Sequence, residues 1–400
     1  MKLSIPIPEV RNGTPTALLT RSGGPEWHSD GVARLFRTSG TVLKLGLEVV
    51  LYGFLLSLSR FLISIPMNLT QTAQALAAEL AGIDFEHLPI SDYNKQYIRR
   101  MQPALSYYLK IYARCLTEGM QLAGVAKIEE LSLVDYGGGC GFFSLLASRA
   151  GVGKVIYVDL NPRSVETVRI LKERLGFGPD VIIEGDSYDL ESWCDEEKEK
   201  PQLLVGTDVI EHIYDVMDCF YNFVSINKRI AMIFTTASTP YNPWVKRRLY
   251  RWMDEAERGT GEQPNYWTLR REYFRKKFPL ASDEELDYWA DITRGQTYEA
   301  IDIGIEENDL SSTILPGPHN TCDPRTGNWM ERILPIAEYR KFATIIGYRV
   351  DVGKGFYNER RANRAASLAC RLLNGLIRCS GKLGLLLAPF IVLRFRKKGA

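Results

Sequence analysis

The segment Asp135–Gly141, with the sequence DYGGGCG, has the residue types and spacing that suit ligand binding by the backbone. It follows the apolar run 131–134 and precedes a helix-like pattern over residues 142–149. Glycines at alternate positions leave backbone N–H groups uncovered, and the amino end of a helix favours a polar or anionic group. The segment therefore predicts a strand, a turn and a helix that together bind a nucleotide-like molecule.

The spacing of these glycines argues against a dinucleotide site. A dinucleotide fingerprint has the pattern G-x-G-x-x-G, and its third glycine lets the helix pack closely against the strand. Counted from Gly137, the third position is Phe142, and counted from Gly139 it is Ser144. An NAD-dependent oxidoreductase is therefore an alternative that the spacing disfavours.

Three further aspartates each follow an apolar run, as Asp135 does. Asp159 ends the run 154–159, Asp186 comes shortly after residues 181–183, and Asp208 follows residues 203–207. Parallel strands of an α/β sheet end at one edge, so we expect these side chains to meet in one cleft. A carboxylate about 20 residues beyond a glycine turn accepts hydrogen bonds from ribose hydroxyls, which is the role predicted for Asp159. A strand-end aspartate has an alternative role as the cap of the helix that follows.

Together these segments resemble the class I S-adenosylmethionine-dependent methyltransferases. Residues 135–141 resemble the first motif of that family. Residues 208–213 (DVIEHI) are similar to the D-V-L-E-H-V segment of its ubiquinone-biosynthesis O-methyltransferase-like branch, methyltransferase types 11, 12 and 23. The resemblance covers residues 131–235 and implies S-adenosylmethionine as the cofactor, with Asp186 receiving the adenine amino group. The expected cofactor-binding residues are Asp135, Gly137, Gly138, Gly139, Gly141, Asp159, Leu160, Asp186, Ser187 and Asp208.

Methyl transfer to a hydroxyl needs an aligned acceptor and a group that takes its proton. His212 and Asp208 are the candidates for that group, and His319 is a further one. We expect His212 in the first turn of a helix that begins at Val209, where a histidine can equally be a structural hydrogen-bonding residue. Seven cysteines without a C-x-x-C pair give no zinc or disulfide framework, so we predict a reducing compartment and transfer without a metal ion.

The alternation of strand-like and helix-like segments predicts an α/β fold with a doubly wound, Rossmann-like sheet. Later strands are expected at 230–235, 346–352 and 390–396. The resemblance implies seven strands in the order 3-2-1-4-5-7-6, mostly parallel with an antiparallel last strand, with N-terminal helices and an insertion between strands five and six. The expected parts are a flexible arm (1–40), a helical region (41–125), the S-adenosylmethionine-binding core (126–238), the insertion (239–340), and the last two strands (341–400) with a basic helical excursion (358–388).

Two apolar segments outside the core suggest membrane contact. Residues 42–67 are rich in Leu, Val, Phe and Ile, but their longest uncharged run, 49–59, is too short to cross a bilayer. Residues 358–388 combine leucines with arginines, a composition typical of a helix on a membrane surface. The alternative for both is a helix packed on the protein or in a homodimer face. We expect a cytoplasmic protein with peripheral contact to the membrane.

The insertion is the expected lid and acceptor pocket. It holds five of the seven tryptophans with several arginines and lysines, which suits an amphipathic, lipid-linked or glycan acceptor methylated on oxygen rather than nitrogen. The same residues could form a small core with a solvated basic face. The formal net charge of +2 and the lack of a nucleic-acid-binding motif argue against nucleic acid. The alternatives are a methyltransferase for a soluble small molecule or sugar intermediate, and a cofactor-binding scaffold without activity.

Overall fold

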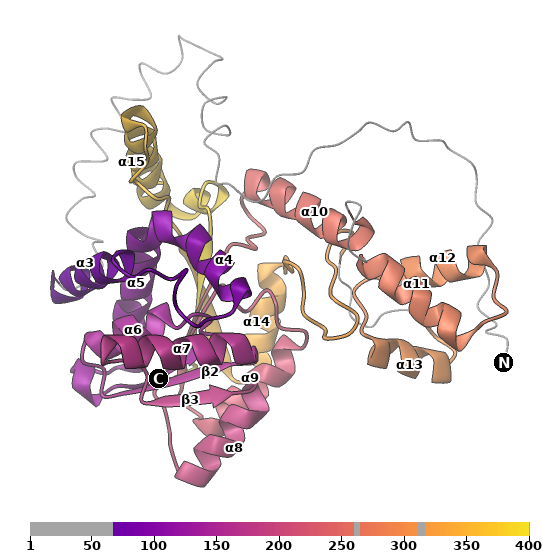
Figure 1. The fold of residues 1–400 in the computed structure, drawn as a ribbon, viewed down its shortest axis with the longest axis horizontal. Coiled ribbons are helices and arrows are strands. Elements are labelled where there is room, and N and C mark those ends of the chain that lie inside the picture. Colours follow the sequence, from indigo (N-terminus) through magenta and orange to yellow (C-terminus); the bar gives the residue numbers. More distant parts are fainter. Residues whose placement is uncertain (1–66, 260–264, 311–316, 400) are drawn as a thin grey trace. The chain divides into compact units, whose positions relative to one another are not determined.

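The computed structural model describes residues 67–259, 265–310 and 317–399 (Figure 1). The predicted arm (1–40) and nearly all of the apolar segment 42–67 lie outside the described residues. The described residues divide into two compact units. The helical insertion consists of Glu211–Tyr214 and Pro243–Leu334, and the sheet unit consists of 67–210, Asp215–Asn242 and 335–399.

The sheet unit is built around a seven-stranded sheet with the strand order β3-β2-β1-β4-β5-β7-β6. The first five strands pair in parallel, whereas β7 is antiparallel to both β5 and β6. This order confirms the sequence-based prediction and is that of the class I methyltransferase fold. The strands are β1 (Ser132–Tyr136), β2 (Lys154–Asp159), β3 (Val181–Glu184), β4 (Leu203–Thr207), β5 (Ala231–Thr236), β6 (Tyr348–Lys354) and β7 (Ile391–Lys397).

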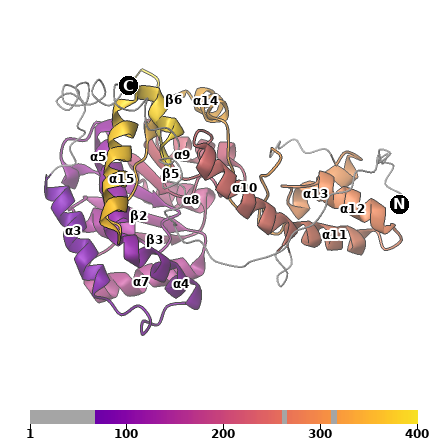
Figure 2. The same ribbon diagram turned by 90° about the horizontal axis from the view of Figure 1, so that it is seen from above.

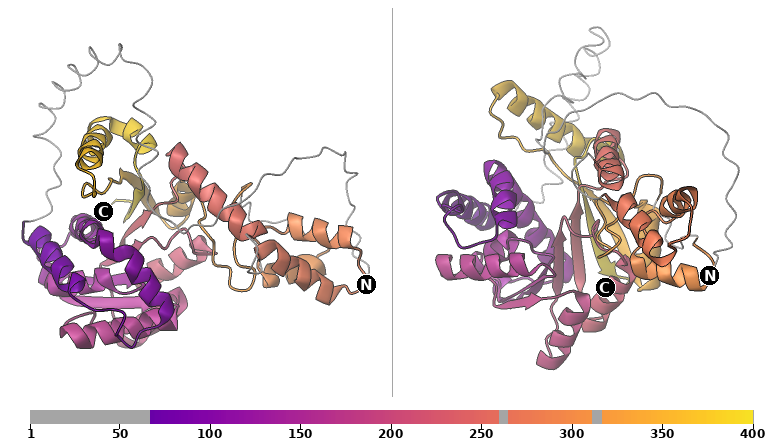
Figure 3. Two further views of the ribbon diagram at one scale, coloured as in Figure 1. Left: turned by 45° about the horizontal axis from the view of Figure 1, so that its top comes forward. Right: turned by 45° about the vertical axis from the view of Figure 1, so that its right-hand side comes forward.

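Helices cover both faces of the sheet, which explains why its central strands are continuous apolar runs. One apolar cluster joins Leu133, Leu203 and Ile233 to helices α5 and α6. On the other face, the Phe220 ring of α9 packs against Phe234 and Phe395. Figure 3 shows these two helical layers on either side of the strands. The helices of this unit are α3 (Met67–Ala81), α4 (Asp92–Met101), η1 (Gln102–Ala104), α5 (Leu105–Ala123), η2 (Ile128–Glu130), α6 (Phe142–Arg149), α7 (Pro162–Leu175), α8 (Ser187–Glu197), α9 (Val216–Ile226), α14 (Ile336–Ile345), α15 (Arg364–Cys379) and η3 (Gly381–Leu386).

The predicted helix that begins at Val209 is wrong. Residues 210–212 form a turn, and α9 begins only at Val216. The reason is the side chain of Asp215, which accepts hydrogen bonds from two backbone N–H groups in the first turn of α9 and so fixes the helix start there. Asp208 also has left-handed backbone, with φ of 59°, which interrupts a helix at this point.

The helical insertion has its own small core, in which Phe274 and Trp289 pack with Leu286 and Ile301. Beside this core lies a buried ion pair between Arg270 and Glu257, whose side chains are 0% and 1% exposed. Arg270 also donates to the carbonyl oxygen of Ala290, and Thr321 donates to Glu257. The helices of this unit are α10 (Pro243–Arg258), α11 (Tyr266–Lys277), α12 (Asp283–Ile292) and α13 (Tyr298–Glu306).

The predicted helical excursion between β6 and β7 is present as α15 and η3 (Figure 2). Asn363 caps α15 by accepting from the backbone N–H of Ala365 at 2.8 Å. None of the helices in the described ranges combines the length and apolarity needed to cross a membrane.

Candidate functional site

The glycine turn joins the carboxyl end of β1 to the amino end of α6. A Cβ on Gly138 would lie 2.6 Å from the ring of Tyr157, so this glycine allows the turn to pack down on β2. Gly139 has φ of 54° and open space where its Cβ would be, with no atom within 4 Å. The first residue of α6 follows Gly141, which offers no side-chain cap, and in the first turn the N–H of Ser144 is bonded to Asp135. The turn is therefore a backbone cradle at the end of β1.

Asp135 supports this cradle from below. The residue is fully buried, and its Oδ2 accepts hydrogen bonds from the backbone N–H and the hydroxyl of Ser144, at 3.1 and 2.6 Å. Burial raises the pKa of Asp135 to about 7, although the two hydrogen bonds from Ser144 act in the opposite direction. Its Oδ1 is buried and has no hydrogen-bond partner in the described part of the chain. One acceptor at the base of the turn is thus still unsatisfied.

Asp159 fixes the turn from the side. Its Oδ2 accepts the backbone N–H of Gly139 at 2.8 Å, and its Oδ1 accepts that of Asn161 at 2.8 Å. Burial raises the pKa of Asp159, and both hydrogen bonds lower it. Each carboxylate oxygen can accept a second hydrogen bond, so the side chain can still take two ribose hydroxyls. The neighbouring Leu160 is 71% exposed and offers an apolar surface beside it.

Asp186 and Ser187 both have structural partners. Asp186 caps α8 by accepting from the backbone N–H of Tyr188 at 2.8 Å, and Asp189 accepts from the N–H of Asp186 in return, which forms a capping box. The Ser187 hydroxyl is buried and accepts from the Asn222 amide at 3.0 Å. Asp186 therefore caps α8, as the alternative interpretation of a strand-end aspartate expected. Its contact with the adenine amino group stays a prediction.

Three tyrosines from the N-terminal helices gather near Asp208. Tyr97 lies on α4, and Tyr108 and Tyr112 lie one turn apart on α5. Burial raises the pKa of all three hydroxyls, and the negative charge of Asp208 raises them further. Tyr97 is 40% exposed when the whole residue is considered, but its hydroxyl group is buried.

These tyrosines were not predicted, because the sequence gives no sign that α4 and α5 reach the end of β4. The signal that could have pointed to them is the pair of tyrosines four residues apart, Tyr108 and Tyr112, which share one face of a helix. Three protonated hydroxyls beside the exposed carboxylate of Asp208 form a polar group able to bind and orient an acceptor oxygen.

The two candidate histidines belong to the helical insertion. The Nδ1 atom of His212 lies 2.8 Å from the carbonyl oxygen of Trp329, to which it donates a hydrogen bond. The Nδ1 atom of His319 lies 3.0 Å from the Asp254 carboxylate, and its ring stacks on Tyr250. Asp208 belongs to the sheet unit. The proton-accepting roles of His212 and Asp208 stay predictions.

Comparison with known proteins gives structural likenesses at low identity. No protein-family model matches the sequence, and no curated protein sequence is significantly similar to it. Similar solved structures include PKMT2 from Rickettsia typhi in complex with AdoHcy, at 11% identity over 71% of this chain and 53% of that chain, with a TM-score of 0.37. An S-adenosylmethionine-dependent methyltransferase from Mesorhizobium loti is 14% identical over 74% of this chain and 97% of that one, with a TM-score of 0.33.

A third similar structure is magnesium protoporphyrin IX methyltransferase from Synechocystis PCC 6803 with bound SAH. It is 12% identical over 82% of this chain and 96% of that chain, with a TM-score of 0.33. Because all these TM-scores are low, the assignment of the fold rests on the strand order of the sheet, and the functional argument rests on the residues of the site.

Proposed function

We propose that the protein transfers a methyl group from S-adenosylmethionine to an oxygen of an amphipathic acceptor. The observation that carries this proposal is the contact between the glycine turn and β2, where the Asp159 carboxylate accepts the N–H of Gly139 at 2.8 Å. This contact places a carboxylate with free lone pairs beside an open backbone cradle, at the carboxyl edge of a sheet with the class I methyltransferase order. A ligand crevice is expected at that edge.

The charges of the site suit a cationic ligand. The buried Tyr112 hydroxyl senses the charge of both Asp135 and Asp208, and Asp135 in turn senses Asp159, so three carboxylates lie near one another. The negative charge of Asp159 and Asp208, with a partial contribution from Asp135 because its pKa is raised to about 7, favours a sulfonium and an ammonium group and would repel the pyrophosphate of a dinucleotide. The unsatisfied Oδ1 of Asp135 is one acceptor that such a ligand would satisfy. The residues present therefore fit S-adenosylmethionine.

The chain's own residues then orient the acceptor and receive its proton. S-adenosylmethionine, when bound, supplies a methyl group that its positively charged sulfur has already activated. The hydroxyls of Tyr97, Tyr108 and Tyr112 stay protonated because their pKa values are raised, so they can donate hydrogen bonds to an acceptor oxygen. Asp208 is the carboxylate beside them and is our choice for the group that takes the acceptor's proton.

The amphipathic character of the acceptor is supported by α15, which has two apolar faces. One face is buried, with Cys370 and Ile377 at 6% and 1% exposure. The other face presents Leu368, Leu372 and Leu376 to solvent at 57%, 61% and 43% exposure. A surface helix ordinarily has a polar solvent-facing side, so the exposed leucine row of α15 is unusual for a helix that faces only water.

Basic residues border the exposed leucine face. Arg364, Arg371 and Arg378 recur every seven residues along α15, and all three are exposed beside the leucine row. Leucines flanked by arginines suit the boundary between lipid headgroups and acyl chains, where each basic residue adds about 1 kcal/mol near an anionic leaflet. We therefore assign this face to an anionic membrane surface, which would bring the site to a lipid-linked acceptor.

The activity is tested with S-adenosylmethionine carrying a tritiated methyl group, incubated with a lipid extract and, separately, with an aqueous extract. The proposal expects label in the lipid fraction, and its loss in Asp208→Asn, which keeps size but cannot take a proton. Label in the aqueous fraction alone would favour a soluble acceptor. Binding of S-adenosylhomocysteine without transfer to either extract would favour a scaffold.

Membrane docking is tested by flotation with vesicles of phosphatidylcholine containing phosphatidylglycerol. Replacing Leu368, Leu372 and Leu376 with glutamine should abolish flotation, because burial of each leucine contributes about 1.5–3 kcal/mol. The matched control is Leu280→Gln in the helical insertion, a fully exposed leucine outside this face. Unchanged flotation of the triple variant would refute the assignment of the leucine face.

A further inference from the structure

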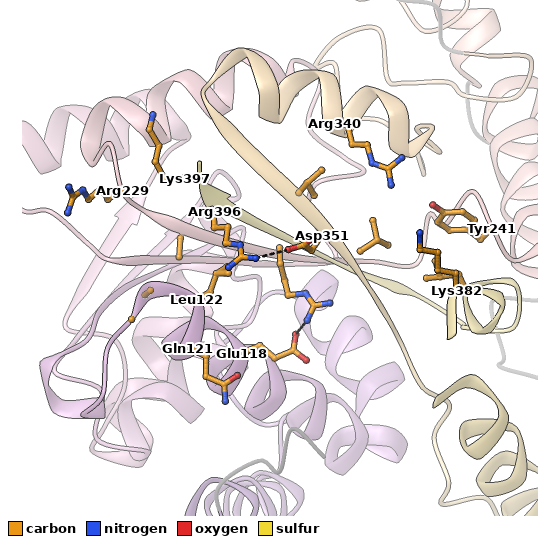
Figure 4. Close-up of a pocket in the computed structure, with 17 residues that line it drawn as sticks. Glu118, Gln121, Leu122, Arg229, Tyr241, Arg340, Asp351, Lys382, Arg396 and Lys397 are labelled. Atoms are coloured by element: carbon orange, nitrogen blue, oxygen red, sulfur yellow. Dashed lines mark ion pairs between the residues drawn. The ribbon is translucent and has the colours of Figure 1, made fainter. Parts of the chain in front are cut away.

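A cavity of about 960 Å³ lies on the sheet unit, over the side of the sheet formed by β5, β7 and β6. It is bounded by the carboxyl end of α5, the strands β6 and β7, and η3 (Figure 4). Ala231, the first residue of β5, lines it, and Gly119 of α5 lies directly over Leu203, the first residue of β4. Strands β4 and β5 separate β7 and β6 from β1, and the cavity's lining includes neither the glycine turn nor Asp159, Asp208 or the tyrosines beside it, so this cavity is separate from the proposed methyl-transfer site.

Basic side chains dominate the lining of this cavity. Two acidic residues, Glu118 and Asp351, also line it. The basic residues come from four separate segments of the chain, so the sheet topology brings them together. They are Arg229, Arg340, Lys382, Arg394, Arg396 and Lys397. We call this set the basic cavity.

The floor of the basic cavity holds two incompletely compensated arginines. Arg394 lies 3.5 Å from Glu118, and Arg396 lies 3.7 Å from Asp351, both longer than a good ionic hydrogen bond. Glu118 is engaged more closely by Arg114, at 2.7 Å. The Nε atoms of Arg394 and Arg396 are buried and have no hydrogen-bond partner in the described ranges. Buried N–H groups without a partner are uncommon, so the pairing of these two arginines within the described ranges is incomplete.

The rim adds cations that are not neutralised. Arg229, Arg340 and Lys382 are exposed, and none of these side chains has a hydrogen bond or ion pair with another described residue. In Figure 4, Arg340 and Lys382 lie on one side of Arg396, and Arg229 and Lys397 lie on the other. Positively charged side chains therefore lie on both sides of Arg396. Repulsion among them is relieved most directly by a multiply charged anion.

We propose that the basic cavity binds a phosphate-bearing anion. Guanidinium groups match the oxygen geometry of phosphate, and each of the two floor arginines has only one long ion pair, which leaves terminal N–H groups for such a ligand. The phosphate is either that of a free diphosphate compound or that of a lipid headgroup. The second source has a specific route, because η3 places Lys382 at the cavity and presents Leu383 and Leu386 to solvent. This site does not depend on methyl transfer, so its test does not read that activity.

The test uses the full chain and two probes. Inorganic pyrophosphate is titrated by calorimetry, and sedimentation is measured with phosphatidylcholine vesicles with and without phosphatidylglycerol. One variant combines Arg340→Gln with Lys382→Gln on the exposed rim, where folding is not at risk. The other is Arg396→Gln on the floor. Loss of charge-assisted hydrogen bonds should weaken binding about tenfold or more for each arginine.

The matched control removes two charges elsewhere, with Arg169→Gln and Arg174→Gln on α7, which packs on β2 and β3 at the far side of the sheet. Pyrophosphate binding that both cavity variants weaken and the control preserves supports a site for a free anion. Sedimentation only with phosphatidylglycerol, weakened in the same pattern, supports a headgroup site. Absence of binding to both probes, or an equal loss in the control, overturns the proposal.

Discussion

Replacement of Asp159 by asparagine perturbs the predicted ribose contact with little change in shape. The carboxylate lies between two backbone N–H groups, those of Gly139 and Asn161, each at 2.8 Å. Asparagine keeps the size of the side chain but loses the charge and one of the two acceptor oxygens. We therefore expect weaker binding of S-adenosylhomocysteine and a small loss of stability in the turn.

The size of the binding effect follows from the hydrogen bonds that the substitution removes. A hydrogen bond to an ionised group contributes about 1.5–3 kcal/mol. Since about 1.4 kcal/mol corresponds to a tenfold change in Kd, loss of one such bond weakens binding about tenfold to about 150-fold. A backbone N–H left facing an amide group costs a further 1 kcal/mol or so of folding free energy.

The assay is calorimetric titration of S-adenosylhomocysteine, with urea unfolding of the same samples. Asp180→Asn is the matched control, because Asp180 accepts the backbone N–H of Val155 at 2.7 Å at the opposite end of β2. The control should lose stability and keep its Kd. If Asp159→Asn binds as tightly as the wild type, or if Asp180→Asn weakens binding equally, the reasoning about the ribose contact is refuted.

Three further predictions concern stability. Because burial raises the pKa of Asp135 from 3.8 to about 7, its contribution to stability is full below the unfolded value and falls by about 4 kcal/mol in all as the pH rises to about 7, of which about 3 kcal/mol is lost above about pH 5. Urea unfolding of Asp135→Asn at about pH 5 and about pH 8 should lack this fall of about 3 kcal/mol, and an unchanged pH slope would contradict the prediction. Gly138→Ala should abolish binding of S-adenosylhomocysteine and cost about 1–3 kcal/mol in urea unfolding, because its Cβ meets Tyr157 at 2.6 Å; normal binding would contradict this. Arg270→Met leaves Glu257 buried without its cation and should destabilise the helical insertion by about 3–5 kcal/mol, seen as faster hydrogen exchange there; unchanged exchange would contradict it.

The strand order and the positions of the aspartates were predictable because their signals are local. Apolar runs that end in a carboxylate, separated by helical patterns, specify parallel strands and the edge at which they end. The glycine turn was equally visible, since its conformation is set by its own residues. The hydrogen bonding of Asp135 to Ser144 was harder to predict, because nothing in the sequence identifies Ser144 as its partner.

The remaining parts of the site depend on contacts between distant segments. The tyrosines near Asp208 come from helices whose place on the sheet the sequence does not specify. The start of α9 was missed because several aspartates compete as caps, and Asp215 is the one that bonds the first turn. In β7, the alternation of Arg394 and Arg396 with apolar residues predicts one polar face, but only the fold shows that this face lines a cavity.

The most direct test of the methyl-transfer account is a crystal structure of the full chain with S-adenosylhomocysteine. The account predicts the adenosyl group against the backbone of residues 137–141, with both ribose hydroxyls within hydrogen-bond distance of the Asp159 carboxylate and the sulfur facing the tyrosines beside Asp208. Density for the ligand at another place, or protein side chains filling the space beside Gly139, would contradict it.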